Sequence, residues 1–165
     1  MKKILFFFLL SLNLGAAVKA PNQDFKLTEL DIFYPGKKTS EIKTKWGDGE
    51  VVEKGPPEIR RYVVAAPNYQ IIVLVQIQND TVIDFYAKLP SYFLHDIFHQ
   101  SLINKLGKQN RYYLENETAV YVWNNVQGLE HTYASACTIT CFPIYYTVNS
   151  GSGKSLQQKF LDFFK

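Results

Sequence analysis

The chain has 165 residues, enough to bury one sizeable core, and its formal charge is +3. Lys2, Lys3 and Lys19 lie in the N-terminal segment 1–20, which has no acidic residue, so the rest of the chain carries 15 basic and 15 acidic residues. This balance argues against a nucleic-acid binder, and beyond residue 20 no apolar run approaches the roughly 20 residues of a membrane span.

Residues 1–20 have the pattern of a secretory signal peptide. Two lysines precede the apolar run from Ile4 to Leu10, and small residues follow up to Ala20. Cleavage after Ala17 and cleavage after Ala20 both fit the pattern. No cysteine lies near either site, so we predict a periplasmic or secreted protein without a lipid anchor or a membrane span.

The first predicted helix begins at Thr39 or Ser40, either of which can cap a helix, and ends at Gly47. Strand-like segments follow at 59–65, 69–78 and 82–86, with a turn at Asn79-Asp80 between the last two. Alternation within the longest strand predicts one buried face. That face consists of Ile71, Val73, Val75 and Ile77.

The same order of elements recurs about 60 residues later. A helical run from Ser91 to Leu106, formed by one helix or two, ends in Lys105-Leu106-Gly107, which matches Lys45-Trp46-Gly47. Strand-like segments follow at 119–123, 129–138 and 143–148. A shift of 61 residues aligns Ile83 and Phe85 with Ile144 and Tyr146, which indicates an insertion of one residue between the two sets of strands.

These patterns predict an α+β fold of two tandem helix-plus-three-strand repeats, with the helices packed on one face of an antiparallel sheet. The repeats span residues 29–87 and 88–149. Residues 150–165 follow as an amphipathic C-terminal helix, because Leu156, Phe160, Phe163 and Phe164 recur at helical spacing. This helix either covers the core or docks onto another protein.

A small set of positions resembles the motif of the BamE (SmpA/OmlA) family of bacterial envelope proteins. The set consists of Ile32, Gly36, Thr39 or Ser40, Ile42, Trp46 and Gly47, followed by three strands. The duplication resembles the tandem-repeat family of the β-lactamase inhibitor protein (BLIP). The resemblance implies helices on one face of an antiparallel sheet, and partners bound by a protein surface instead of an active site.

Four aromatic residues in the second repeat are the predicted partner-binding surface: Tyr121, Trp123, Tyr133 and Tyr145. The alignment sends Ala134 and Ala136 inward, so Tyr133 is expected to point outward. Tyr121 and Trp123 share one face of the neighbouring strand, and Tyr145 lies opposite the inward Ile144 and Tyr146. Trp and Tyr dominate the energetics of protein interfaces. The alternative is that some of the four belong to the core, or that the C-terminal helix covers them with Phe160 and Phe164.

Cys137 and Cys141 are the only cysteines, and an exported protein exposes its cysteines to oxidants. The repeat alignment places them on either side of a tight hairpin, where they face each other. We therefore predict a disulfide bond between them.

Residues with catalytic chemistry are sparse. His95 and His99 have the i, i+4 spacing of a metal-binding pair, but a third ligand is not apparent, so we predict no metal site. No nucleophile or acid–base constellation stands at a recognised spacing, and we predict neither a cofactor nor an enzyme activity. The leading hypothesis is an exported, non-enzymatic protein-binding module of the bacterial envelope or secretome, either an envelope assembly component or an enzyme inhibitor. The alternatives are a small-molecule or glycan-binding domain, or an enzyme of unrecognised type.

Overall fold

The computed structural model describes residues 20, 22–115, 117–136 and 144–150. The two cysteines, residues 1–19 of the predicted signal peptide and residues 151–165 of the predicted C-terminal helix lie outside this part of the chain. In chain order the described elements are the 3-10 helix η1 (Leu27–Phe33), α1 (Thr39–Trp46), β1 (Glu50–Glu53), β2 (Glu58–Ala66), β3 (Tyr69–Gln78), β4 (Thr81–Leu89), α2 (His95–Leu106), β5 (Arg111–Glu115), β6 (Thr118–Val126), β7 (Leu129–Ala136) and β8 (Ile144–Asn149).

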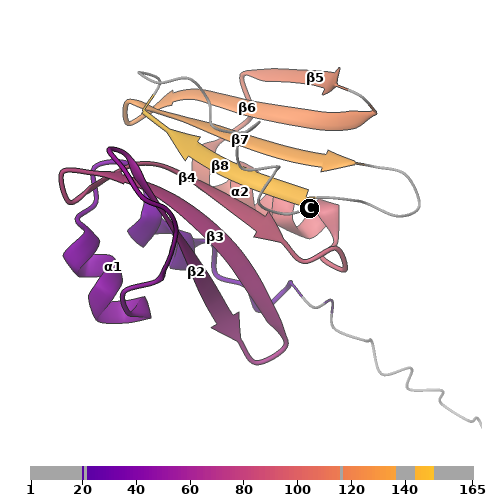
Figure 1. Cartoon of the computed structure of the whole chain (residues 1–165). Helices are drawn as coiled ribbons and strands as arrows, with labels where there is room; N and C mark the ends of the chain where they lie inside the picture. The colour runs from indigo at the N-terminus through magenta and orange to yellow at the C-terminus, as the bar shows by residue number, and fades with distance from the viewer. Residues whose placement is uncertain (1–19, 21, 116, 137–143, 151–165) are drawn as a thin grey trace, which may run out of the picture.

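The eight strands form one sheet in the order β1-β2-β3-β4-β8-β7-β6-β5 (Figure 1). Every neighbouring pair is antiparallel. The last strands of the two halves of the chain, β4 and β8, pair at the centre, with Ala87 opposite Tyr146. Outward from this centre follow the third strand of each half, β3 and β7, and then the second, β2 and β6, so that β1 and β5 are the two edges of the sheet.

The predicted fold of two helix-plus-three-strand repeats is wrong. Each half contributes one α-helix and four strands, and all the strands belong to one continuous sheet. The prediction missed β1 and β5, the two edge strands. Both are short, and none of their residues is fully buried, so they lack the apolar alternation by which the inner strands are identified.

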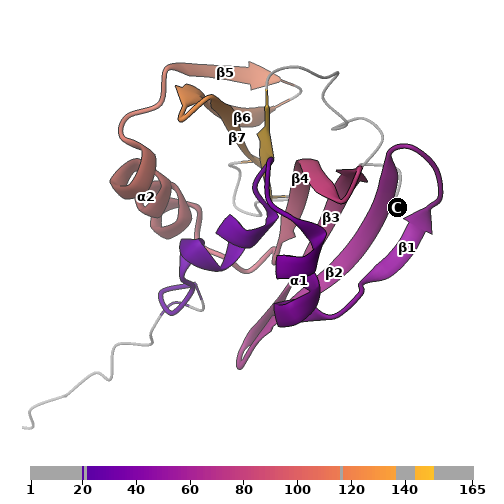
Figure 2. The same ribbon diagram turned by 90° about the vertical axis from the view of Figure 1, so that its left-hand side faces the viewer.

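The main core lies between the helices and one face of the sheet (Figure 2). Buried side chains of η1, α1 and α2 pack there against the inward-facing side chains of the strands. The inward set of β3 is the predicted one, and all four members are buried. Its residues are Ile71, Val73, Val75 and Ile77.

The predicted facing of β7 is wrong by one residue. Tyr133 points into the main core, whereas Ala134 lies on the opposite face with Val120 and Val122. His131 and Tyr133 stand 60 residues after Ile71 and Val73 and face the same side. The extra residue of the second half therefore lies between β7 and β8, and not before β7 as predicted. A shift of one residue exchanges the two faces of a strand, which explains the wrong facing.

Gly47 and Gly107 end the two α-helices in the same way. Their φ angles are 78° and 83°, and each N–H donates to the carbonyl oxygen four residues earlier. Positive φ is readily adopted by glycine, so the predicted end of α1 is confirmed. The α2 helix begins at His95, four residues after the predicted start. None of the helices in the described ranges has the length and apolar character needed to cross a membrane.

Candidate functional site

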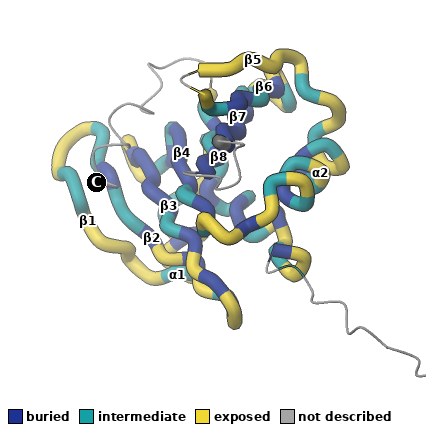
Figure 3. The backbone as a smooth tube through the Cα atoms, turned by 90° about the vertical axis from the view of Figure 1, so that its right-hand side faces the viewer, coloured by how far each residue is buried: buried dark blue, intermediate teal, exposed yellow. Residues whose placement is uncertain are grey.

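The edge strand β5 exposes all five of its residues (Figure 3). Three consecutive large apolar side chains stand in the middle of it: Tyr112 is 55% exposed, Tyr113 is 42% exposed and Leu114 is 67% exposed. Among the residues that the structure describes, only β6 pairs with β5, so the N–H and C=O groups on the other side of the strand have no neighbouring strand there. Such an edge is a template for pairing with another chain.

The opposite edge strand is different. β1 has four residues, begins and ends with glutamate, and shifts its register against β2 between Val51 and Glu53. Glu50 also pairs with Arg61 at 3.0 Å between Oε2 and Nη1. Short length, charge and an irregular register are the devices by which proteins protect sheet edges. β5 is also short and has charged ends, but its three middle residues are uncharged and it pairs with β6 in unbroken register from Arg111 to Glu115.

The start of β5 is fixed by hydrogen bonds to β6. The Asn110 backbone N–H donates to the Val122 carbonyl at 2.8 Å, and the Asn110 side-chain oxygen accepts from the backbone N–H of Asn124 at 2.6 Å. Just before this point, the indole N–H of Trp123 donates to the Gly107 carbonyl at 2.7 Å. These bonds hold the edge strand in place against the end of α2, so the exposed surface is preorganised.

Three of the four predicted partner-binding residues lie on β6 and β7, the two strands nearest to β5 in the sheet. Tyr121, Trp123 and Tyr133 all face the helix side of the sheet. Trp123 is 1% exposed and Tyr133 is completely buried, so both belong to the core. The half-buried Tyr121 contacts the exposed Tyr112, with ring centroids 5.1 Å apart. The predicted outward patch is therefore wrong in its geometry, but Tyr121 supports an aromatic surface on β5 that the prediction missed.

Two histidines of α2, His95 and His99, pack against Tyr121 and Tyr133. His95 Nδ1 lies 3.1 Å from the Tyr133 hydroxyl, and the His99 ring lies 4.1 Å from the Tyr121 ring. The two imidazole rings stack with centroids 5.2 Å apart. Burial lowers the pKa of both histidines, which favours neutral rings. Across the described ranges, no three His, Cys, Asp or Glu side chains are grouped as metal ligands.

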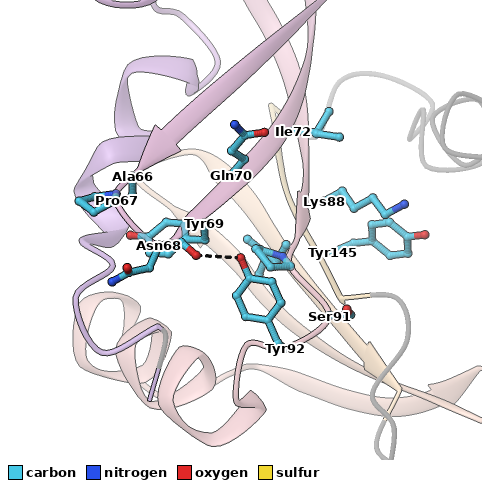
Figure 4. Close-up of a pocket in the computed structure, with 12 residues that line it drawn as sticks. Ala66, Pro67, Asn68, Tyr69, Gln70, Ile72, Lys88, Ser91, Tyr92 and Tyr145 are labelled. Atoms are coloured by element: carbon cyan, nitrogen blue, oxygen red, sulfur yellow. Dashed lines mark hydrogen bonds between the residues drawn. The ribbon is translucent and has the colours of Figure 1, made fainter. Parts of the chain in front are cut away.

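The fourth predicted residue, Tyr145, lies on the opposite face of the sheet, as its alternation with Ile144 and Tyr146 predicts. It lines an open hollow of about 880 Å³ (Figure 4). Tyr69 and Tyr92 contribute further aromatic rings, and the Tyr92 hydroxyl donates to the Asn68 carbonyl at 3.2 Å. Lys88 and Gln70 add a cation and an amide to the lining.

The predicted disulfide between Cys137 and Cys141 falls outside the described residues.

No family model, no curated protein and no solved structure matches this chain.

Proposed function

We propose that this protein is a non-enzymatic protein-binding module that accepts a strand of its partner at the free edge of β5. The observation that carries the proposal is the exposure of all five residues of β5, three of them large and apolar, on an edge strand that pairs only with β6 among the described strands. In strand addition, main-chain hydrogen bonds supply affinity and alternate side chains supply specificity.

The side chains of β5 provide anchors on both faces of an extended sheet. Tyr112 and Leu114 lie on the helix side, opposite Tyr121 and Ala119, whereas Tyr113 lies on the other side, opposite Val120. Tyrosine buries a large, rigid area while its hydroxyl stays able to form a hydrogen bond. A partner strand with apolar residues at matching positions would bury these rings together with its own backbone.

We also propose that the protein acts in the periplasm or outside the cell, because residues 1–20 have the pattern of a signal peptide. An envelope assembly role and an inhibitory role both fit an exported module that binds through a strand edge. The resemblance of Ile32, Gly36, Thr39 or Ser40, Ile42, Trp46 and Gly47 to the motif of the BamE family favours the envelope assembly role.

Capture experiments with edge variants test the proposal. The double variant Tyr112→Lys, Leu114→Lys places two cations on β5 without altering a buried side chain, and lysine is a natural protector of edge strands. Val51→Lys, at an exposed position of β1, is the matched control. We expect the β5 variant to lose its partner and the β1 variant to keep it, with unchanged circular dichroism for both. Equal capture by the two variants would contradict the proposal.

The hollow beside Tyr145 favours a second function, the binding of a small molecule or glycan. It combines three tyrosines with Lys88 and Gln70 in an open space of about 880 Å³, and ligand sites typically combine apolar walls with a few polar groups. Mass spectrometry of material released from the purified protein tests this function. A ligand that is retained by the wild type and lost from Tyr92→Ala would support it, and protein free of any ligand would count against it.

A further inference from the structure

The sequence of β5 is complementary to itself when two copies run antiparallel. The strand reads Arg-Tyr-Tyr-Leu-Glu from Arg111 to Glu115. If Tyr113 of one copy stands opposite Tyr113 of a second copy, Arg111 stands opposite Glu115 at both ends, and Tyr112 stands opposite Leu114. Residues directly opposite in an antiparallel pair point to the same face. The charged pairs therefore meet on one face and the apolar pairs on the other.

We infer that the strand added to β5 is β5 of a second copy, related by a two-fold axis through Tyr113, so that the two sheets join into one. This inference rests on the proposed function, because it identifies the partner that the free edge accepts. A two-fold interface must be self-complementary. If one residue contacts a second residue of the other copy, then that second residue contacts the first one of the other copy in turn. The strand meets this condition in both charge and apolar character.

The other edge strand, β1, is not complementary to itself. β1 reads Glu-Val-Val-Glu from Glu50 to Glu53, and antiparallel pairing of two copies around its centre would place glutamate opposite glutamate at both ends. Like charges directly opposite destabilise a strand pair. The chain thus carries one edge that repels its own copy and one that attracts it, which gives a closed dimer instead of an open chain of sheets.

The charged ends of β5 are available for such contacts. The Arg111 side chain is 57% exposed, and its Nη2 lies 3.7 Å from Glu130 Oε2 of its own chain, on the same face of the sheet. The guanidinium has five N–H donors and can serve a second carboxylate. Glu115 is exposed at the other end of the strand. In the dimer, Arg111 would lie between Glu130 of its own chain and Glu115 of the other copy.

Charge exchange tests the inference and its register. Arg111→Glu and Glu115→Arg each place like charges at both ends of the paired strands, so the dissociation constant of the dimer should rise roughly tenfold or more. Sedimentation equilibrium at protein concentrations up to about 1 mM measures it. An equal mixture of the two variants should restore association, because every opposite pair then has opposite signs. Glu50→Gln on β1 is the control, because it creates no attractive charged pair at that edge, and it should leave the dimer unchanged.

Cross-linking provides a second test of the two-fold axis. Tyr113→Cys would bring two thiols together with their Cβ atoms about 4.5–5.5 Å apart, within reach of a disulfide after small adjustments. We expect a covalent dimer on a non-reducing gel for this variant, and none for Val51→Cys or for the wild type with its two natural cysteines.

A chain that stays monomeric at every concentration overturns the inference, and so does a dimer whose strength is unaffected by the charge variants. If the monomer still captures a different protein and loses it on Tyr112→Lys, Leu114→Lys, the inference fails while the proposed function stands. If the β5 variants change neither self-association nor capture, both fail.

Discussion

The indole N–H of Trp123 donates a hydrogen bond of 2.7 Å to the carbonyl oxygen of Gly107. This bond joins the end of α2 to β6 and lies where the chain turns into the edge strand. Trp123 is 1% exposed and packs in the main core. Trp123, which was predicted to bind a partner, is therefore a core residue whose hydrogen bond fixes the chain just before β5 begins.

Two replacements of Trp123 should separate the cost of its lost hydrogen bond from the cost of a cavity in the core. Trp123→Phe keeps most of the apolar contact and leaves the Gly107 carbonyl without its indole donor, which should cost about 1–3 kcal/mol of unfolding free energy. Trp123→Ala also creates a cavity and should cost about 3–5 kcal/mol. Urea unfolding measures both. A cost for Trp123→Ala below about 1 kcal/mol would show that Trp123 is not a core residue.

A buried histidine makes the stability depend on pH. Burial, and secondarily the charge of Lys105, lowers the pKa of His131 to about 4, and its Nδ1 lies 2.7 Å from the Tyr146 hydroxyl. The ordinary value in an unfolded chain is about 6.5. Between these two values the unfolded state binds a proton that the folded state does not, so stability falls as the pH falls from about 6.5 to about 4.

The contribution of His131 over that range should be about 2–4 kcal/mol. His131→Gln removes the titrating ring and retains polar atoms for the Tyr146 hydroxyl. We expect the variant to lose less stability than the wild type between pH 7 and pH 4, as measured by urea unfolding at several pH values. Parallel pH profiles for the two proteins would show that His131 does not have this role.

Asp84, on the face of the sheet opposite the helices, changes the pH dependence of stability in the opposite direction to His131. Burial raises its pKa to about 7, and no described residue forms a hydrogen bond with its buried Oδ1. The folded state therefore holds a proton that the unfolded state releases near pH 4, and stability falls as the pH rises from about 4 to about 7. Asp84→Asn should stabilise the protein at pH 8 by about 1–3 kcal/mol and have a smaller effect at pH 4.

The exposed Glu117→Gln serves as the control for Asp84→Asn and should change stability little at either pH. Thermal unfolding at pH 4 and pH 8 measures both variants. A loss of stability in Asp84→Asn at pH 8 would mean that the ionised carboxylate is favourable in the fold, contrary to the prediction.

The inner strands were predictable from the sequence and the edges were not. β3 follows from the alternation of Ile71, Val73, Val75 and Ile77, because both of its neighbours bury the same face. β1 and β5 have one neighbour each and little burial, so no periodic signal distinguishes them from loops. The run Tyr112-Tyr113-Leu114 has strong strand propensity and was the available signal for β5.

The four residues predicted to bind a partner were assigned to the wrong side of the sheet, in part, for a related reason. The strand containing Tyr133 was identified, but its register was transferred from the first half with an insertion in the wrong place, and a strand's facing depends on single-residue register. Tyr121 and Trp123 were correctly assigned to one face of β6. Which face the helices cover depends on the path of the whole chain, and local pattern does not determine it.

Amide hydrogen exchange of β5 tests the central claim most directly. Exchange is compared between dilute free protein and protein saturated with its partner, whether a second copy or a different chain. Strand addition predicts that amides within Arg111–Glu115 become protected in the complex, because their free N–H groups gain acceptors, while amides within Glu50–Glu53 stay unchanged. Unchanged exchange across β5 in a saturated complex would contradict the account.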